Sequence, residues 1–232
     1  MHSPTLSPPD RATPPPAGLR TGAVCAFLAV ALTVLVTARW SPLMSLDRTV
    51  ADALHRRAVA EPGLVGVSRV LTDWVWDPWT MRALIAVAVI ALWRGGARVL
   101  ALWVAVTSAL AAVVQQGLKS AVGRDRPRWP DPVDSAHYAA FPSGHAMTAA
   151  VSCGLLLWLL RRHAVTPPVW RAAAVAAAVS VAGVGATRVY LGVHWMSDVL
   201  GGWLLGAALV AFSVAAHARY TSDGRALLPP RS

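Results

Sequence analysis

Six runs of apolar residues constrain the fold of this chain more than any other feature of its sequence. A helix needs about 20 predominantly apolar residues to cross the hydrocarbon core of a bilayer, and each run is near that length. The runs occupy residues 21–38, 80–94, 97–118, 145–161, 169–187 and 195–216. This pattern predicts an all-α membrane protein in which six transmembrane helices form a bundle.

The overall composition agrees with a membrane location. The chain has 232 residues, of which 56% are hydrophobic and 14% are charged, whereas about a quarter of the residues in soluble domains are charged. One helical bundle accounts for most of this length, so we expect a single domain over residues 21–218. The proline-rich residues 1–20 are expected to form a disordered tail, and residues 219–232 a C-terminal tail.

The first apolar run has two interpretations. Residues 21–38 carry no charge, and Val36, Thr37 and Ala38 resemble a signal-peptide cleavage site. The run is long for a signal peptide, however, and five further apolar runs follow it. These observations favour a retained membrane helix.

The connection at 39–78 mixes charged and apolar residues at a spacing typical of amphipathic helices. We expect one or two short helices here, lying at the membrane interface in the first outer loop. Tryptophan is enriched at membrane–water boundaries, so Trp74, Trp76 and Trp79 are interpreted as interfacial anchors.

Two short, arginine-rich connections predict the orientation. They lie at 94–98 and at 161–171, where Pro167 and Pro168 interrupt the helix. Short basic connections face the cytoplasm, so both termini are expected there and the connections at 119–145 and 187–198 outside. A count over all 21 basic residues divides almost evenly between the two sides, so the prediction depends on the short connections.

The formal net charge of +10 raises the question of an acidic partner. The basic residues lie between apolar runs, and no nucleic-acid-binding motif is present, so we expect no nucleic-acid partner. Topology and attraction to anionic headgroups account for the charge.

Cys25 and Cys153 lie inside apolar runs, where buried cysteines behave as small hydrophobes, and we predict neither a disulfide nor a zinc site. Gly202 and Gly206 form a G-x-x-x-G pair, for which packing within one chain is favoured over a dimer interface.

Ionisable residues gather in the two connections expected outside, where they are costly unless paired or functional. Three cations, Lys119, Arg126 and Arg188, could bind phosphate oxygens. Lys119 and Arg126 are seven residues apart and would share a helix face if the helix continued, although Pro127 disturbs it. Ser143 and Gly144 precede an apolar helix, whose free N–H groups form a ready anion site. These features favour a phosphate ligand.

Two histidines and one aspartate could provide the reactive groups. His194 and Asp198 are four residues apart, so on a helix they share a face. A carboxylate on one imidazole nitrogen fixes the tautomer and leaves the other nitrogen free to attack. His145 could protonate the leaving oxygen. Phosphoryl transfer depends mainly on positioning and charge stabilisation, so these groups would suffice without a metal or other cofactor.

Simpler interpretations exist for each residue alone. An isolated histidine near a membrane boundary is usually interfacial, an arginine there is usually a topology signal, and a Ser-Gly pair is usually a helix cap. His145, His194 and Asp198 could also hold zinc, although three nearby cations would repel the metal.

Three sequence blocks, taken together, identify a family. Residues 119–127 have the pattern K-x6-R-P, residues 142–145 read P-S-G-H, and residues 188–198 have the pattern R-x5-H-x3-D. In this order they resemble the type 2 phosphatidic acid phosphatase superfamily. That family includes membrane lipid phosphatases, undecaprenyl-diphosphatases, soluble acid phosphatases and vanadium haloperoxidases. The blocks cover about a third of the chain, and the six-helix layout extends the resemblance to nearly everything after residue 20.

The resemblance implies a role for each matching residue. The phosphate would be bound by five of them: Lys119, Arg126, Ser143, Gly144 and Arg188. His194 would attack phosphorus, Asp198 would orient His194, and His145 would be the acid. Family members usually have serine where this chain has Thr187, which leaves a phosphate-binding role at that position open.

The resulting hypothesis is a metal-free membrane phosphatase that acts on a lipid phosphate or diphosphate through a phosphohistidine. One alternative is a vanadate-dependent haloperoxidase, although the family's haloperoxidases are soluble. Another is a non-catalytic lipid-phosphate binder or transporter, which would not need His145, His194 and Asp198. The sequence does not distinguish a prenyl diphosphate from a phosphatidate-like substrate.

Overall fold

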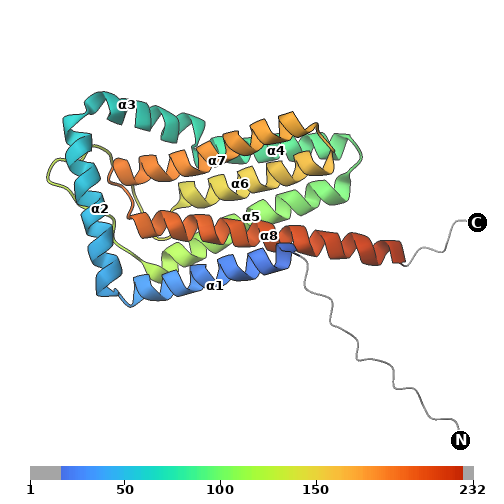
Figure 1. Cartoon of the computed structure of the whole chain (residues 1–232), viewed down its shortest axis with the longest axis horizontal. Helices are drawn as coiled ribbons and strands as arrows, with labels where there is room; N and C mark the ends of the chain where they lie inside the picture. The colour runs from blue at the N-terminus through green and yellow to red at the C-terminus, as the bar shows by residue number, and fades with distance from the viewer. Residues whose placement is uncertain (1–16, 227–232) are drawn as a thin grey trace, which may run out of the picture.

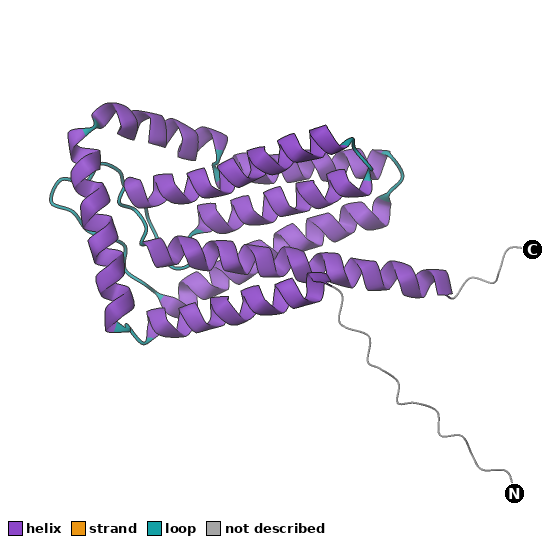
Figure 2. Cartoon of the chain, in the orientation of Figure 1, coloured by secondary structure: helices purple, strands orange, loops and turns teal. Residues whose placement is uncertain are grey.

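Six long helices lie alongside one another in the computed structural model, which describes residues 17–226 (Figure 1). A 20-residue helix, α2, crosses one end of this bundle, and the short helix α3 leads back from it toward α4. The elements, in chain order, are α1 (Ala17–Thr37), α2 (Ser41–Ala60), α3 (Pro62–Val70), a π-helical turn η1 (Leu71–Val75), α4 (Pro78–Arg94), α5 (Arg98–Val122), α6 (Gly144–Arg162), α7 (Pro167–Tyr190) and α8 (Met196–Ala226). All regular elements in this part of the chain are helical (Figure 2), which confirms the all-α prediction.

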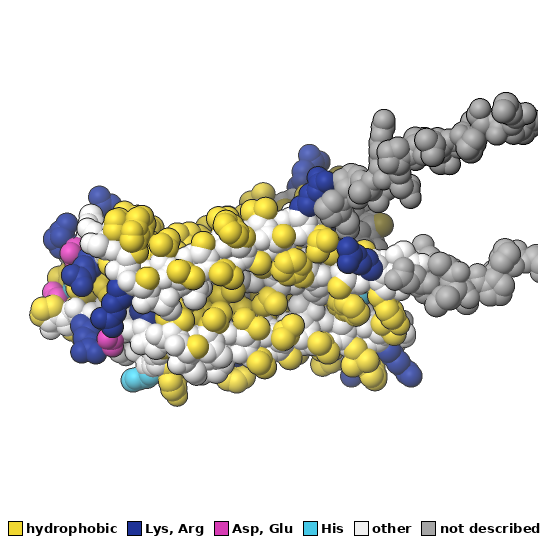
Figure 3. Space-filling view, turned by 90° about the horizontal axis from the view of Figure 1, so that it is seen from below, with side chains coloured by type: hydrophobic (Ala, Val, Ile, Leu, Met, Phe, Trp, Pro, Cys, Tyr) yellow, Lys and Arg dark blue, Asp and Glu magenta, His cyan; other side chains and the backbone are white. Residues whose placement is uncertain are grey.

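Six stretches of the described chain are long and apolar enough to cross a membrane. Exposed apolar side chains cover the middle of the molecule, whereas basic side chains gather toward its two ends and acidic side chains are visible at one of them (Figure 3). Phe27, Val87 and Val113 belong to this apolar surface, with 72%, 65% and 68% of their areas exposed. Such a surface is stable only against lipid, so the chain is a multi-pass membrane protein.

The helix boundaries differ from the expected ones in ways that matter for the site. Helix α5 continues past residue 118 to Val122, so it carries Lys119 in its last turn. Helix α1 begins at Ala17, inside the segment expected as a tail, and residues 1–16 lie outside the described residues. Helix α8 continues to Ala226, so residues 219–226 are helical and 227–232 lie outside the description.

Helix α6 is the centre of the bundle and packs against α4, α5, α7 and α8. Its Met147, Val151 and Leu155 are buried in a cluster with Ile85 of α4 and Val104 of α5. This packing fixes the first turn of α6, which carries several of the predicted site residues.

The Gly202 and Gly206 pair lets α8 approach α6 closely. A methyl group added to Gly206 would lie 2.8 Å from the Ala150 Cβ and 3.0 Å from the Met147 carbonyl oxygen. One added to Gly202 would lie 2.7 Å from the Ser143 carbonyl oxygen. The pair therefore serves packing within one chain, as the sequence favoured.

Helix α2 crosses the end of the bundle at which α5 and α7 end and α6 and α8 begin (Figure 1). It has the one-sided pattern expected of an amphipathic helix, burying Asp47, Ala51, His55 and Ala58 at helical spacing. A buried aspartate on such a face needs a partner, and Asp47 is paired with Arg124 of the connection after α5.

Candidate active site

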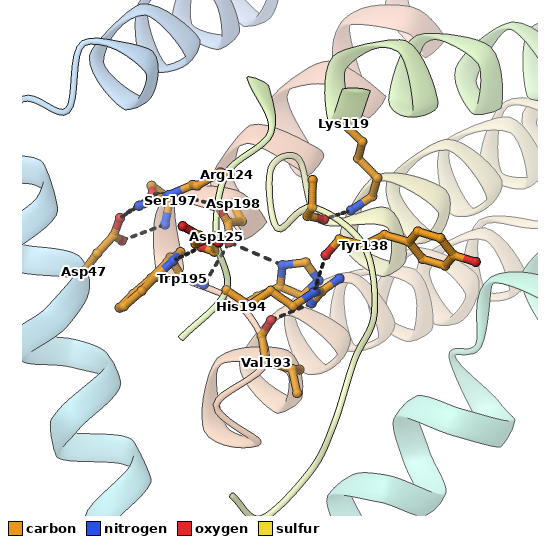
Figure 4. Close-up of polar contacts among 12 residues, drawn as sticks. Asp47, Lys119, Arg124, Asp125, Tyr138, Val193, His194, Trp195, Ser197 and Asp198 are labelled. Atoms are coloured by element: carbon orange, nitrogen blue, oxygen red, sulfur yellow. Dashed lines mark hydrogen bonds and ion pairs between the residues drawn. The ribbon is translucent and has the colours of Figure 1, made fainter. Parts of the chain in front are cut away.

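The candidate site lies at the end of the bundle that α2 covers, and five segments contribute to it. These are the last turn of α5, the connection 123–143, the first turn of α6, the end of α7, and the segment 191–198 that leads into α8. Figure 4 shows side chains from three of these segments, the last turn of α5, the connection 123–143 and the segment 191–198, together with Asp47 of α2. Residues far apart in the sequence are thus held by the ends of rigid helices, which suits a preorganised site.

His194 and Asp198 form the buried pair at the centre. The distance from His194 Nδ1 to Asp198 Oδ2 is 3.3 Å (Figure 4), and the two residues are 1% and 0% exposed. They meet as predicted, but not on one helix face, because α8 begins only at Met196. Asp198 Oδ2 also accepts a hydrogen bond from the Trp195 backbone N–H over 2.9 Å, as a carboxylate at a helix start commonly does.

Arg126 determines which nitrogen of the His194 ring is unprotonated. Its Nη1 lies 2.6 Å from the Val193 carbonyl oxygen and 3.1 Å from His194 Nε2. A guanidinium only donates hydrogen bonds, so Nε2 must accept and the proton is on Nδ1, facing Asp198. The neutral tautomer therefore presents the Nε2 lone pair toward the cations.

The surroundings keep His194 uncharged. Burial, together with the positive charges of Arg126, Arg188 and Lys119, holds the pKa of its imidazole well below the ordinary value. Burial and the charge of Arg188 also lower the pKa of Arg126, to about 10. Arg126 is still a cation at neutral pH, while His194 is a neutral base, and that is the combination a nucleophilic histidine needs.

The three predicted cations come together, although not along one helix. Helix α5 ends at Val122, and Gly123 with φ 57° turns the chain, so Arg126 reaches Lys119 from the following loop. Arg126 also donates from Nε to the Tyr138 carbonyl oxygen over 2.9 Å and from Nη2 to the His137 carbonyl oxygen over 3.1 Å. Lys119 donates to the Ala139 carbonyl oxygen. The segment 137–139 thus supplies carbonyl partners to two cations in this state.

Arg188 is the most deeply buried of the three cations, with 4% of its area exposed. Its Nη1 lies 3.9 Å from Asp73 Oδ1, a long contact, and its Nε has no hydrogen-bond partner among the described residues. A buried cation with an unused donor is costly. Its presence is explained if an anion supplies the missing acceptor.

Ser143 has the same property. It is fully buried, and its hydroxyl has no partner within residues 17–226. It precedes α6 as the predicted N-cap residue, but its side chain does not make the capping bond. Gly144 packs so closely that an added methyl group would lie 2.7 Å from Gln115 Nε2. Such a hydroxyl, at the start of a helix whose His145 is within electrostatic reach of Arg188 and His194, fits a tetrahedral oxyanion.

His145 lies in the first turn of α6 and is partly buried. It is within electrostatic reach of Arg188, His194, Arg126 and Lys119. Thr187, by contrast, donates its hydroxyl hydrogen bond to the Val184 carbonyl oxygen of its own helix over 3.0 Å. That bond gives no support to a phosphate-binding role for Thr187.

The described residues contain no cluster of three His, Cys, Asp or Glu side chains placed as metal ligands would be. The zinc arrangement considered from the sequence therefore has no ligand set in this part of the chain. Cys25 and Cys153 are both free.

The structure adds two residues to which the sequence assigned no role. Arg124, two residues before Arg126, contacts Asp198, and Asp47 of α2 contacts Arg124 (Figure 4). Arg124 is one of several ionisable residues in the connection 119–145, and Asp47 lies in the mixed-charge segment 39–78. The one available signal was that each is an ionisable residue beside membrane helices.

A sequence model of the PAP2 superfamily matches residues 100–222. The chain belongs to this superfamily. All three sequence blocks fall within the matched residues. Helices α1 to α4 precede the matched region.

Named PAP2 relatives share parts of the chain. A phosphatidylglycerophosphatase B of Bacillus subtilis (strain 168) is 38% identical over 93 residues, which cover 40% of this chain and 45% of that protein. An undecaprenyl-diphosphatase of Sulfolobus acidocaldarius is 39% identical over 85 residues, covering 37% of this chain and 35% of that protein. The chain thus spans less than half the length of these curated relatives.

A solved structure shares the fold over nearly the whole chain. It is the crystal structure of a transmembrane PAP2-type phosphatidylglycerolphosphate phosphatase from Bacillus subtilis, with a TM-score of 0.73 and 23% sequence identity. The match covers 91% of this chain and 99% of that one. This likeness shows a shared overall fold.

Proposed function

We propose that this chain is a membrane phosphatase that hydrolyses a lipid phosphate or diphosphate through a phosphohistidine on His194. Residues 21–218 would form the catalytic domain. The proposal is supported by the PAP2 membership, by the printed activities of the two relatives, and by the site geometry. No observation favours the haloperoxidase alternative.

The observation that carries the proposal is the unprotonated Nε2 of His194, which lies in a site where two polar groups that could bind phosphate lack hydrogen-bond partners. Nε2 faces Arg126, while the Ser143 hydroxyl and Arg188 Nε lack partners among residues 17–226. A bound phosphoryl group would give both groups an acceptor and place phosphorus next to Nε2. Mere binding of a headgroup would not need the His194–Asp198 pair.

In the first step, the Nε2 lone pair of His194 attacks phosphorus and the bond from phosphorus to the lipid oxygen breaks. His145, which the negative charge of the bound phosphoryl group favours in its protonated form, gives its proton to the departing oxygen. This oxygen leaves as the lipid alcohol, or as the lipid monophosphate if the substrate is a diphosphate. Asp198 accepts the Nδ1 hydrogen bond and stabilises the positive charge that develops on the ring. Lys119, Arg126 and Arg188 stabilise the negative charge on the equatorial oxygens.

In the second step, water attacks phosphorus and the bond to Nε2 breaks. His145, now neutral, accepts the proton from this water. Inorganic phosphate forms, and His194 and His145 return to their starting protonation states. All groups in both steps are supplied by the protein, the lipid and water.

The position of the site fits a lipid substrate. It lies at one end of the apolar surface shown in Figure 3, where charged side chains begin. A lipid headgroup could reach the cations there while its hydrocarbon chains stay in the bilayer. The names of the two relatives point to phosphatidylglycerophosphate and undecaprenyl diphosphate as the first substrates to test.

We propose further that the site faces the extracytoplasmic side and that both termini are cytoplasmic. The support is the positive-inside rule applied to the short basic connections 94–98 and 161–171. Single cysteines at Arg128 and at Arg94, introduced with Cys25 and Cys153 replaced by serine, test this orientation in intact cells. An impermeant thiol reagent should label the first and not the second, and the reverse pattern would refute the orientation.

The function is tested with purified protein, lipid substrates and a metal chelator. Phosphate release should persist with chelator, and an alkaline quench should trap a phosphohistidine that His194→Ala lacks. His194→Ala should lower kcat by a factor on the order of 10³ or more, since it removes the nucleophile. Activity that depends on added zinc, or His194→Ala at near-normal rates, would refute the mechanism. Binding without turnover would indicate the non-catalytic alternative.

A further inference from the structure

A buried chain of contacts joins α2, which lies outside the bundle, to the catalytic histidine (Figure 4). Arg124 is its centre. Its Nη1 donates to Asp198 Oδ1 over 2.6 Å and to the Ser197 hydroxyl over 2.7 Å. Its Nη2 donates to Asp47 Oδ2 over 2.7 Å.

Asp47 holds the other end of this chain. It is 1% exposed, and besides Arg124 it binds Ser197 twice. Asp47 Oδ1 accepts from the Ser197 backbone N–H over 2.9 Å, and Oδ2 accepts from the Ser197 hydroxyl. A residue of α2 therefore fixes the first turn of α8, from which Asp198 projects.

The contacts leave Asp198 little freedom to rotate. Oδ1 is held by Arg124, and Oδ2 is shared between His194 Nδ1 and the Trp195 backbone N–H. The Arg124 guanidinium also lies over the Trp195 ring, 5.6 Å from its centroid. Rotation of the carboxylate would break a charge-assisted bond at 2.6 Å, so Oδ2 stays directed at the nucleophile.

We propose that Arg124 and Asp47 are positioning residues for the nucleophile: Arg124 orients Asp198, and Asp47 orients Arg124. The inference depends on the proposed function, since it concerns the same His194. Neither residue binds the phosphate, because the hydrogen bonds of Arg124 go to Asp198, Ser197, Asp47 and the Met44 sulfur. Their effect should therefore appear in the chemical step and not in substrate binding.

The geometry requires arginine and not merely a positive charge. The planar fork of Arg124 binds Asp198 through one terminal nitrogen and Asp47 through the other. Lysine has a single ammonium and cannot reproduce this fork. Arg124→Lys should keep both carboxylates neutralised but hold Asp198 less firmly, so its kcat should lie between those of the wild type and Arg124→Gln.

Arg124 and Asp47 also border an open cavity of about 800 Å³ between the end of α1, α2 and the end of α5. Truncation of Arg124 would therefore leave a space that small solutes can enter. This allows chemical rescue: guanidinium ion, below denaturing concentrations, should enter Arg124→Ala and restore part of its kcat.

The experiment compares kcat, KM and inhibition by inorganic phosphate for Arg124→Gln, Asp47→Asn and their double variant. We expect kcat to fall about 10- to 100-fold, as for other residues that orient a reacting group through its partner, with KM and phosphate inhibition unchanged. The double variant should be little worse than Arg124→Gln, because both act through Asp198. One matched control is Arg128→Gln, because the side chains of the Arg128–Asp125 ion pair are 85% and 81% exposed. The other is Asp52→Asn, on the exposed face of α2. Both variants should be as active as the wild type.

Several results would overturn the inference. These are an unchanged kcat in Arg124→Gln, a parallel loss of phosphate inhibition, or no rescue of Arg124→Ala by guanidinium. If Arg124→Gln does not fold, Arg124→Lys decides in the same way: a lower kcat at unchanged phosphate inhibition supports the inference, and wild-type kcat refutes it. A wild type without activity on lipid phosphates would refute the proposed function itself, whereas an active wild type with unimpaired variants would refute only the positioning role.

Discussion

Arg126 Nη1 lies 3.1 Å from His194 Nε2, so a cation proposed to bind phosphate contacts the atom that is proposed to attack phosphorus. Because arginine only donates, this contact fixes the His194 tautomer even without a substrate. An arriving phosphoryl group must take over this donor. Substrate binding would therefore break the hydrogen bond between Arg126 and His194 and leave the Nε2 lone pair available to attack.

Asp198→Asn should lower kcat strongly while leaving the fold intact. An asparagine amide can present N–H to His194 Nδ1 and so favour the wrong tautomer, a change that costs about 10⁴-fold in a comparable triad. Steady-state kinetics on a lipid phosphate measures the loss. The exposed Asp52→Asn is the control, and a loss in Asp198→Asn of less than about tenfold, on the scale of one weakened hydrogen bond, would contradict the assigned role.

Ser143→Ala should weaken catalysis without weakening the protein. The Ser143 hydroxyl is buried without a partner among the described residues, so its removal costs the free protein no hydrogen bond. In the complex it would remove a bond to a charged phosphoryl oxygen, which corresponds to a loss of kcat/KM of roughly 10- to 100-fold. Ser120→Ala, whose hydroxyl bonds within its own helix, should be neutral in kinetics and melting temperature. A large drop in the melting temperature of Ser143→Ala would show that the hydroxyl is structural.

The lowered pKa of His194 predicts a pH-dependent contribution to stability. In the unfolded chain this histidine gains a proton near pH 6.5, whereas in the fold it stays neutral to lower pH. The unfolded state then binds more protons below pH 6.5, so stability is lost as pH falls through that value. The slope is at most about 1.4 kcal/mol per pH unit.

Melting temperatures of the wild type and His194→Asn in detergent test this linkage. The difference, wild type minus variant, should be constant above pH 6.5 and decrease below it, because every other titrating group is present in both proteins. A difference that stays constant, or that grows toward acid pH, would show that His194 is protonated in the fold.

Gly206→Val should loosen the contact between α6 and α8. A side chain there meets Ala150 Cβ and the Met147 carbonyl oxygen at 3.0 Å or less, and overpacking of this kind costs about 1–3 kcal/mol. At roughly 2–4 °C per kcal/mol for a protein of this size, the melting temperature should fall by several degrees. Gly117→Ala on α5, where nothing lies within 4 Å of the added methyl, is the matched control. Equal melting temperatures for the two variants would contradict the packing role.

The sequence was sufficient to predict the bundle, because each membrane helix is encoded by a continuous apolar run. The four-residue spacing predicted that His194 and Asp198 would meet, and the resemblance to the type 2 phosphatidic acid phosphatase superfamily implied the other residues around them. The spacing placed His194 on the helix with Asp198, however, and the structure begins α8 after His194. The reason is local: Asp198 binds the Trp195 backbone N–H, a cap that an acidic residue in a first turn often makes.

The pairing of Asp47 with Arg124 could not be predicted in this way. The two residues are 77 positions apart, and each lies outside an apolar run. Their contact depends on how α2 turns across the end of the bundle, which follows from tertiary packing and not from any local spacing. The carbonyl partners of Arg126, at His137 and Tyr138, could not be predicted for the same reason.

The Asp47–Arg124 ion pair also limits what a minimal fragment of this chain can do. The PAP2 match begins at residue 100, so a fragment cut there would keep Lys119, Arg126, His145 and His194. It would lack Asp47 and leave the Arg124 guanidinium with one carboxylate in place of two. If Asp47 positions Arg124 as proposed, the catalytic unit is longer than the region that the family model matches, and it includes α2.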